Sequence, residues 1–157
     1  MAESRAIARY FAEKYQDQGV PLLGKSVKER AIINQWTEVE SQTFNVAVGP
    51  MIRELFVSDV MKRPLNEAVI DAGLAKLLPA FDVYEAQLSK HKYIAGDEYS
   101  LADLFHIPTL NYLMTTLKTE VYGNHPRVLA WAENIISRPA VQKVVELNAK
   151  WLKQQTQ

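Results

Sequence analysis

The stretch Tyr99-Ser100-Leu101-Ala102-Asp103-Leu104 decides how this chain folds, because it predicts where a buried helix begins. Ser100 and Asp103 have the spacing of a capping box, in which the hydroxyl and the carboxylate each accept from the other residue's amide. Tyr99 and Leu104 have the positions of a hydrophobic staple. Apolar residues then continue on nearly every side of the expected helix: Leu101, Phe105, Ile107, Pro108, Leu110 and Tyr112. A helix of that kind belongs in the centre of a bundle.

Helical patterns precede and follow this stretch, so we expect an all-α bundle of about six or seven helices. The other expected helices begin at Ser4, Ser26, Asn66, Pro126 and Pro139. No segment shows the two-residue alternation that is typical of a strand. Pro50 predicts a kink near Ala47, and Pro79 predicts a bend in the helix that contains it. Residues 115–125 are expected to form a polar return, and Trp151 is expected to dock the C-terminal tail.

Composition is typical of an ordinary globular domain. The 157 residues are 48% hydrophobic and 23% charged, which is enough for a sizeable core. The 18 basic and 18 acidic residues cancel without forming charged runs, so neither nucleic acid nor a membrane is an expected partner. The absence of cysteine excludes disulfides and cysteine nucleophiles in this chain. Because the start of the chain also lacks the apolar run of a signal peptide, we expect a cytoplasmic protein.

Few residues could carry chemistry. The histidines His91, His106 and His125 lie far apart in the sequence, and no His, Asp or Glu residues have metal-ligand spacing, so no metal is expected. His106 follows Asp103 by three residues, a spacing that resembles a base with its orienting carboxylate. We interpret Asp103 instead as a cap and His106 as a helix-face histidine with a backbone or water partner.

Glu3 and Ser4 stand at the start of the first expected helix. A carboxylate, a hydroxyl and free amide groups at a helix N-terminus suit the carboxylate and ammonium groups of a small ligand. Taken by itself, however, Ser4 is typical of an ordinary helix N-cap.

The longer word Glu3-Ser4-Arg5-Ala6-Ile7-Ala8-Arg9-Tyr10 resembles the segment that closes the N-terminal, thioredoxin-like domain of plant phi-class glutathione transferases. Further matching segments are residues 35–40, 82–86, 92–97, 100–104, 106–108, 111–113, 126–131 and 138–140. The resemblance implies that residues 1–17 are the last helix of that domain. It further implies that residues 18–25 are a linker and that residues 26–157 are the C-terminal helical domain.

The resemblance implies a reaction that conjugates the thiol of glutathione, the co-substrate, to a hydrophobic electrophile, as in detoxification. Glu3 and Ser4 would bind the γ-glutamyl end of glutathione. A second-substrate site would be lined by Met51, Phe56 and Tyr112, although these residues are equally typical of an ordinary core. The resemblance also allows a homodimer.

In the family, the residue that activates the thiol lies upstream of the Glu-Ser turn, where this chain begins. No catalytic residue is therefore assigned, and we expect a truncated chain with little or no activity of its own. A second interpretation is a non-catalytic helical module that carries an apolar ligand or docks on a protein partner. In that case the first helix would present an uncovered apolar face, and such faces promote association.

Overall fold

The computed structural model describes residues 2–155, which form eight α-helices and one π-helical turn. The helices are α1 (Ser4–Lys14), α2 (Val27–Val39), α3 (Asn45–Met61), α4 (Glu67–Leu88), α5 (Leu101–Thr116), α6 (Lys118–Tyr122), α7 (Pro126–Ile136) and α8 (Pro139–Gln155), and the π-helical turn η1 is Glu40–Phe44. Because α2, η1 and α3 follow one another without a break, the eight helices form seven separate rods. The described residues contain no β-strand, so the predicted all-α fold is confirmed.

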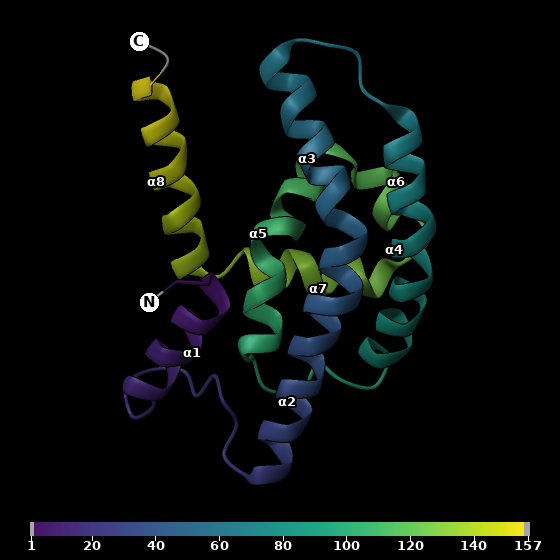
Figure 1. The fold of residues 1–157 in the computed structure, drawn as a ribbon. Helices are drawn as coiled ribbons and strands as arrows, with labels where there is room; N and C mark the ends of the chain where they lie inside the picture. The colour runs from purple at the N-terminus through teal and green to yellow at the C-terminus, as the bar shows by residue number, and fades with distance from the viewer. Residues whose placement is uncertain (1, 156–157) are drawn as a thin grey trace.

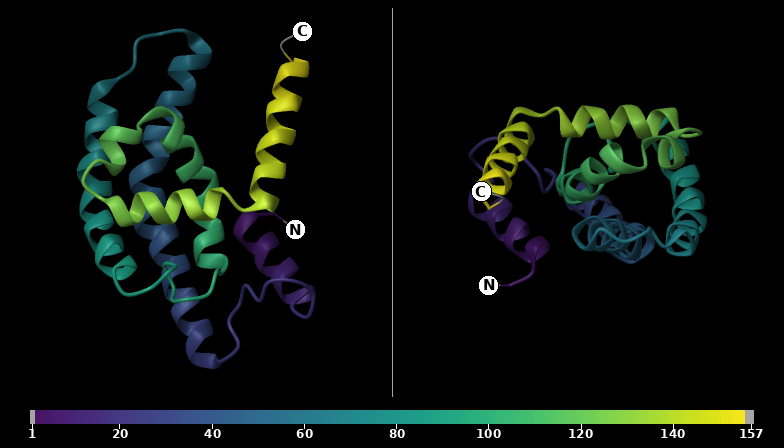
Figure 2. Two further views of the ribbon diagram at one scale, coloured as in Figure 1. Left: turned by 180° about the vertical axis from the view of Figure 1, so that it is seen from behind. Right: turned by 90° about the horizontal axis from the view of Figure 1, so that it is seen from above.

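Helix α5 is the central element of the bundle (Figure 1). It packs against α1, α2, η1, α3, α6 and α7. Helix α4 returns alongside α3, and α7 crosses both α4 and α5 (Figure 2). Helices α1 and α8 lie on the same side of the bundle in all three views. In the described residues, the backbone of α1 approaches only that of α5, and the backbone of α8 approaches only that of α7.

The capping box that starts α5 is present, and its carboxylate has further partners. The amide of Ser100 donates to Asp103 Oδ2 at 2.9 Å, and the amide of Ala102 donates to the Ser100 hydroxyl at 3.3 Å. Asp103 Oδ1 accepts from the Ile94 amide at 3.0 Å and from Trp131 Nε1 at 2.9 Å. The fully buried carboxylate therefore joins α7 and the loop before α5 to the start of α5.

His106 lies in the centre of the aromatic core. Burial lowers its pKa to about 4, so the ring is neutral at pH 7. In that form, Nδ1–H donates to the Ala102 carbonyl at 2.6 Å, and Nε2 accepts from the Tyr84 hydroxyl at 2.9 Å. The predicted backbone partner is confirmed, but the side chain lies in the core and not on an accessible helix face.

Two local predictions are wrong. Residues 118–122 form helix α6 instead of a polar return, because Val121 and Tyr122 are buried against the bundle. Trp151 is 58% exposed and does not dock the tail, since α8 extends away from the core beyond its contact with α7.

The rod that contains Pro50 continues through that residue without interruption. Its irregular turn lies earlier, at η1. Pro50 removes the amide that would bond the carbonyl of Val46, and Val46 is exposed, so water can replace the missing hydrogen bond.

None of the described helices combines the length with the apolar composition that crossing a membrane requires.

Candidate functional site

The N-terminus of α1 has an unusual backbone and free polar groups. Glu3 occupies the N-cap position with φ 68° and ψ 110°, which a residue with a side chain rarely adopts. Ser4 is the first helical residue, so it is not the N-cap that its residue type suggested. Both residues are exposed, and no side chain caps the helix. The amide groups of the first turn have no acceptor within the helix and remain available to a ligand.

A buried ion pair attaches this turn to the bundle. Arg5 Nε and Nη2 donate to the two carboxylate oxygens of Glu40, each at 2.7 Å. Glu40 belongs to η1 and is 1% exposed, and these hydrogen bonds raise the pKa of Arg5. One turn later, Arg9 donates to Asn34 Oδ1 at 2.9 Å and to Thr37 Oγ1 at 2.7 Å. The bidentate geometry of the Arg5–Glu40 pair, together with the contacts of Arg9, orients the start of α1 relative to α2 and η1.

The ion pair was not predicted from the sequence, although the sequence contains a signal for it. Glu40 lies four residues after Trp36 and four before Phe44, and both aromatic residues are buried. A carboxylate on such an apolar helix face requires a partner, because an unpaired buried charge is unfavourable. The spacing does not indicate which residue pairs with it, since Arg5 is 35 positions away.

The three residues predicted for a second-substrate site have different environments. Met51 on α3 is fully buried, and its side chain occupies the space beside Gly73 on α4, so in this conformation it is part of the core. Phe56 on α3 is 59% exposed, and Tyr112 on α5 is half-buried. None of the three lines any of the five cavities found among the described residues. Their role in binding stays a prediction.

The histidines do not gather into a metal site. His106 is held in the core, and His125 Nε2 lies 3.0 Å from Asp82 Oδ1 at the start of α7. In the part of the chain that the structure describes, no group of three or more His, Asp or Glu side chains could hold a metal ion.

Comparison with known proteins identifies the fold. The family model described as "Glutathione S-transferase, C-terminal domain" matches residues 47–139. "Glutathione S-transferase F13" of Arabidopsis thaliana is 43% identical over 143 residues, which make up 90% of this chain and 65% of that protein. Glutathione transferase F7 from Populus trichocarpa has a TM-score of 0.88 and 44% identity, covering 93% of this chain and 69% of that one.

A third relative is glutathione S-transferase I from maize in complex with an atrazine glutathione conjugate. It has a TM-score of 0.82 and 36% identity, covering 94% of this chain and 68% of that one. This chain therefore spans about two thirds of the length of the relatives it matches. The family model covers more than half of the chain, and the sequence identity extends over nine tenths of it. The chain belongs to the phi class of the glutathione S-transferase family.

Proposed function

We propose that this chain provides the helical part of a glutathione conjugation site and that Glu3 and Ser4 hold the γ-glutamyl end of glutathione. The observation that carries the proposal is the exposed turn at Glu3, whose positive φ is maintained beside the Arg5–Glu40 ion pair. Such a backbone conformation costs about 1–3 kcal/mol and is concentrated at functional sites. Membership of the family supports the choice of ligand.

The chemistry of the turn matches the two charges of a γ-glutamyl group. The Glu3 carboxylate can accept from the ammonium group of the ligand. The Ser4 hydroxyl and the amides of the first turn of α1 can donate to its carboxylate, which the positive end of the helix dipole also favours. Because Arg5 is committed to Glu40, it orients the turn and its guanidinium is not the group that we assign to the ligand.

The reaction that this site would serve is thioether formation. The glutathione thiolate attacks an electrophilic carbon, a C–S bond forms, the leaving group departs with its electron pair, and the thiol proton passes to solvent. Stabilising the thiolate requires a donor positioned at the sulfur atom, and we assign that role to no residue of this chain. For the 157-residue chain alone, we therefore propose glutathione binding with weak or no turnover.

A hydrophobic electrophile is the proposed second substrate, since the maize relative was solved with an atrazine glutathione conjugate. Met51, Phe56 and Tyr112 remain the proposed contacts, and Tyr112 is the first to test because it is only half-buried. We also propose a cytoplasmic location, which the absence of cysteine allows.

Calorimetric titration of glutathione into the purified chain tests the proposed binding. We expect saturable binding that is lost in the Glu3→Ala/Ser4→Ala variant. The control is Glu13→Ala, which removes an exposed carboxylate from the other end of α1 and should bind as the unaltered chain does. If the unaltered chain takes up no glutathione, the proposed role of Glu3 and Ser4 is wrong.

A conjugation assay with 1-chloro-2,4-dinitrobenzene tests the second half of the proposal. We expect the 157-residue chain to show a small fraction of the turnover of the F13 relative from Arabidopsis thaliana, measured side by side. Comparable turnover would contradict the proposal that no residue of this chain activates the thiol.

A further inference from the structure

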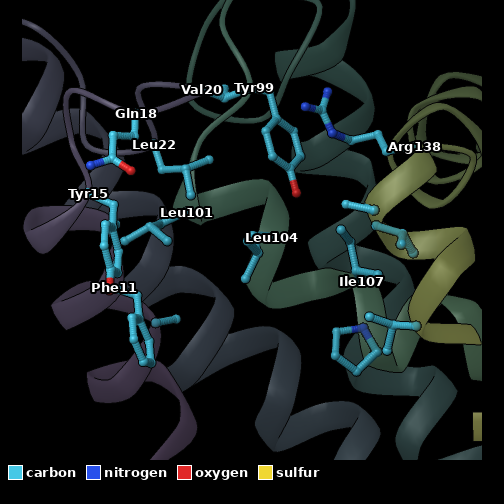
Figure 3. Close-up of a pocket in the computed structure, with 16 residues that line it drawn as sticks. Phe11, Tyr15, Gln18, Val20, Leu22, Tyr99, Leu101, Leu104, Ile107 and Arg138 are labelled. Atoms are coloured by element: carbon cyan, nitrogen blue, oxygen red, sulfur yellow. The ribbon is translucent and has the colours of Figure 1, made fainter. Parts of the chain in front are cut away.

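A polar cavity of about 260 Å³ lies between the C-terminal end of α4 and α7. We call it the basic cavity, and its lining residues are Leu88, His91, Lys92, Arg127, Ala130, Trp131 and Asn134. A larger, apolar cavity of about 570 Å³ lies between α1, α5 and α8, where Phe11, Tyr15 and Leu104 line it (Figure 3). Among the described residues the two cavities share no lining residue, so the basic cavity is a separate feature of the bundle.

The polar side chains that line the basic cavity are all nitrogen-bearing, and no carboxylate of the described residues lines it. Lys92 Nζ lies 5.4 Å from the centre of the Tyr93 ring, and no described carboxylate lies within 4.0 Å of it. Arg127 Nη1 donates to Glu85 Oε1 at 3.1 Å, which leaves the other N–H groups of this guanidinium for a further acceptor. Asn134 adds an uncharged amide from the same helix as Arg127.

Two carboxylates lie next to the basic cavity, and backbone amides engage both of them. Glu85 Oε2 accepts from the amides of Arg127 and Val128, each at 3.0 Å. Asp97 Oδ1 accepts from the amide of Lys92 at 3.3 Å and lies 3.5 Å from His91 Nδ1. The two acidic groups therefore leave Lys92 without an ion-pair partner and Arg127 only partly paired.

The position of Arg127 is a further indication of an anion. This residue belongs to the first turn of α7, where the positive end of the helix dipole disfavours a cation. Lys92 approaches the same cavity from the loop after α4, so two cations from separate elements face one space. Like charges that converge in this way are stabilised by an anion between them.

We propose that the basic cavity binds the phosphate group of a small phosphorylated metabolite, with Lys92, Arg127 and Asn134 as donors. A phosphate monoester carries a charge of about −1.5 to −2 at pH 7, which matches the two cations. Its three terminal oxygens can accept from the loop and from α7 at the same time, whereas a carboxylate has two oxygens in one plane. The volume is below the usual range of drug-sized sites, so it suits a compact group.

Titration of the 157-residue chain with glycerol 3-phosphate, followed by amide nuclear magnetic resonance, tests the proposal. We expect saturable shifts at the amides of Lys92, Arg127 and Asn134 with a Kd of about 1 mM, since exposed charges bind weakly. The ionic strength is held constant with sodium chloride, because salt screens exposed charges. Shifts that do not saturate, or that chloride alone reproduces, would overturn the proposal.

Three single variants test the location of the phosphate. Lys92→Gln and Arg127→Gln should each weaken binding about fivefold, less than a fully buried charged hydrogen bond would lose. Asn134→Asp places a carboxylate of nearly the same shape in the cavity and should abolish binding. The control is Lys28→Gln, which removes an exposed lysine of α2 and should leave the Kd unchanged. Unaltered binding by Asn134→Asp would show that the phosphate does not occupy this cavity.

Two further measurements separate this site from other anion sites. The Glu3→Ala/Ser4→Ala variant should bind glycerol 3-phosphate as the unaltered chain does, because neither residue lines the basic cavity. Loss of binding in that variant would place the anion at α1 and contradict the proposal. Vesicles of phosphatidylcholine and phosphatidate carry the same monoester on a lipid. If the chain sediments with these vesicles but takes up no glycerol 3-phosphate, the small-metabolite proposal is wrong.

Discussion

Asp103 is a buried carboxylate that accepts four hydrogen bonds, two of them from the capping residue Ser100 and one each from Ile94 and Trp131. Burial raises the pKa of Asp103, and these hydrogen bonds act in the opposite direction. The donors come from three separate parts of the chain. One side chain therefore determines both where α5 begins and how α7 packs against it.

Replacing Asp103 should be far more damaging than replacing the other member of the capping box. Asp103→Ala leaves three buried N–H donors without an acceptor, at about 1–3 kcal/mol each, so we expect a loss of at least about 3 kcal/mol in the free energy of unfolding. Ser100→Ala should cost about 1 kcal/mol. Urea denaturation followed by tryptophan fluorescence measures both, and equal losses would contradict the network described here.

The neutral state of His106 makes stability depend on pH. The unfolded chain protonates this residue near pH 6.5, whereas the folded chain protonates it only near pH 4. The contribution of His106 to the free energy of unfolding is therefore complete above pH 6.5. It falls by about 3 kcal/mol as the pH decreases to 4. His106→Asn should flatten this part of the pH profile of urea midpoints.

At the scale of elements, α3 and α4 make an extensive contact. Gly73 on α4 has no side chain, and the side chain of Met51 lies where a Cβ atom would be. Met51 is fully buried, and a side chain at position 73 would require the Met51 side chain to move. Gly49, the residue directly before Pro50 on α3, is different because a Cβ atom there would meet nothing within 4 Å apart from its chain neighbours.

The two glycines give a matched pair. Gly73→Ala should lower the free energy of unfolding by about 1–3 kcal/mol, because it overpacks the contact between α3 and α4. Gly49→Ala should change it by less than about 1 kcal/mol, because alanine loses less conformational freedom than glycine but its Cβ atom crowds the ring of the next residue, Pro50. Thermal and urea unfolding measure both variants. A stable Gly73→Ala variant would show that the two helices can separate without loss of packing.

At the scale of the whole molecule, α1 is joined to the bundle mainly by polar contacts. Its helix has no buried residue, its backbone approaches only α5, and Arg5 and Arg9 bond to η1 and α2. Helices α1 and α8 thereby enclose one side of the bundle, where the apolar cavity lies. The proposed glutathione site depends on the position of α1.

Breaking the Arg5–Glu40 ion pair should loosen α1 selectively. Arg5→Met leaves a buried carboxylate without its partner and should cost about 2–3 kcal/mol, near the low end for a buried pair because the Arg5 side chain is 35% exposed. Hydrogen exchange at the amide of Ile7, which donates to the Glu3 carbonyl at 3.0 Å, should accelerate. The double variant Arg5→Met/Glu40→Gln should recover part of the stability, and Arg53→Met is the surface control. No recovery in the double variant would contradict the assigned partner.

The sequence by itself determined the helical class and the start of α5 at its capping box, because caps and helical periodicity are local interactions within a few residues. It also led us to propose Glu3 and Ser4 as residues that bind glutathione, through a resemblance carried by neighbouring residues. It did not predict α6, which is too short to show a helical period and is held by the burial of Val121 and Tyr122.

Only the tertiary structure decided which distant groups meet. Glu40 is paired with Arg5, Trp131 donates to Asp103, and Arg138 stacks on Tyr99. Each of these contacts joins side chains from different elements, so none leaves a pattern at a fixed spacing. The apolar cavity is of the same kind, because its lining comes from three helices and the loops next to them, whose proximity depends on how α1 and α8 pack beside α5.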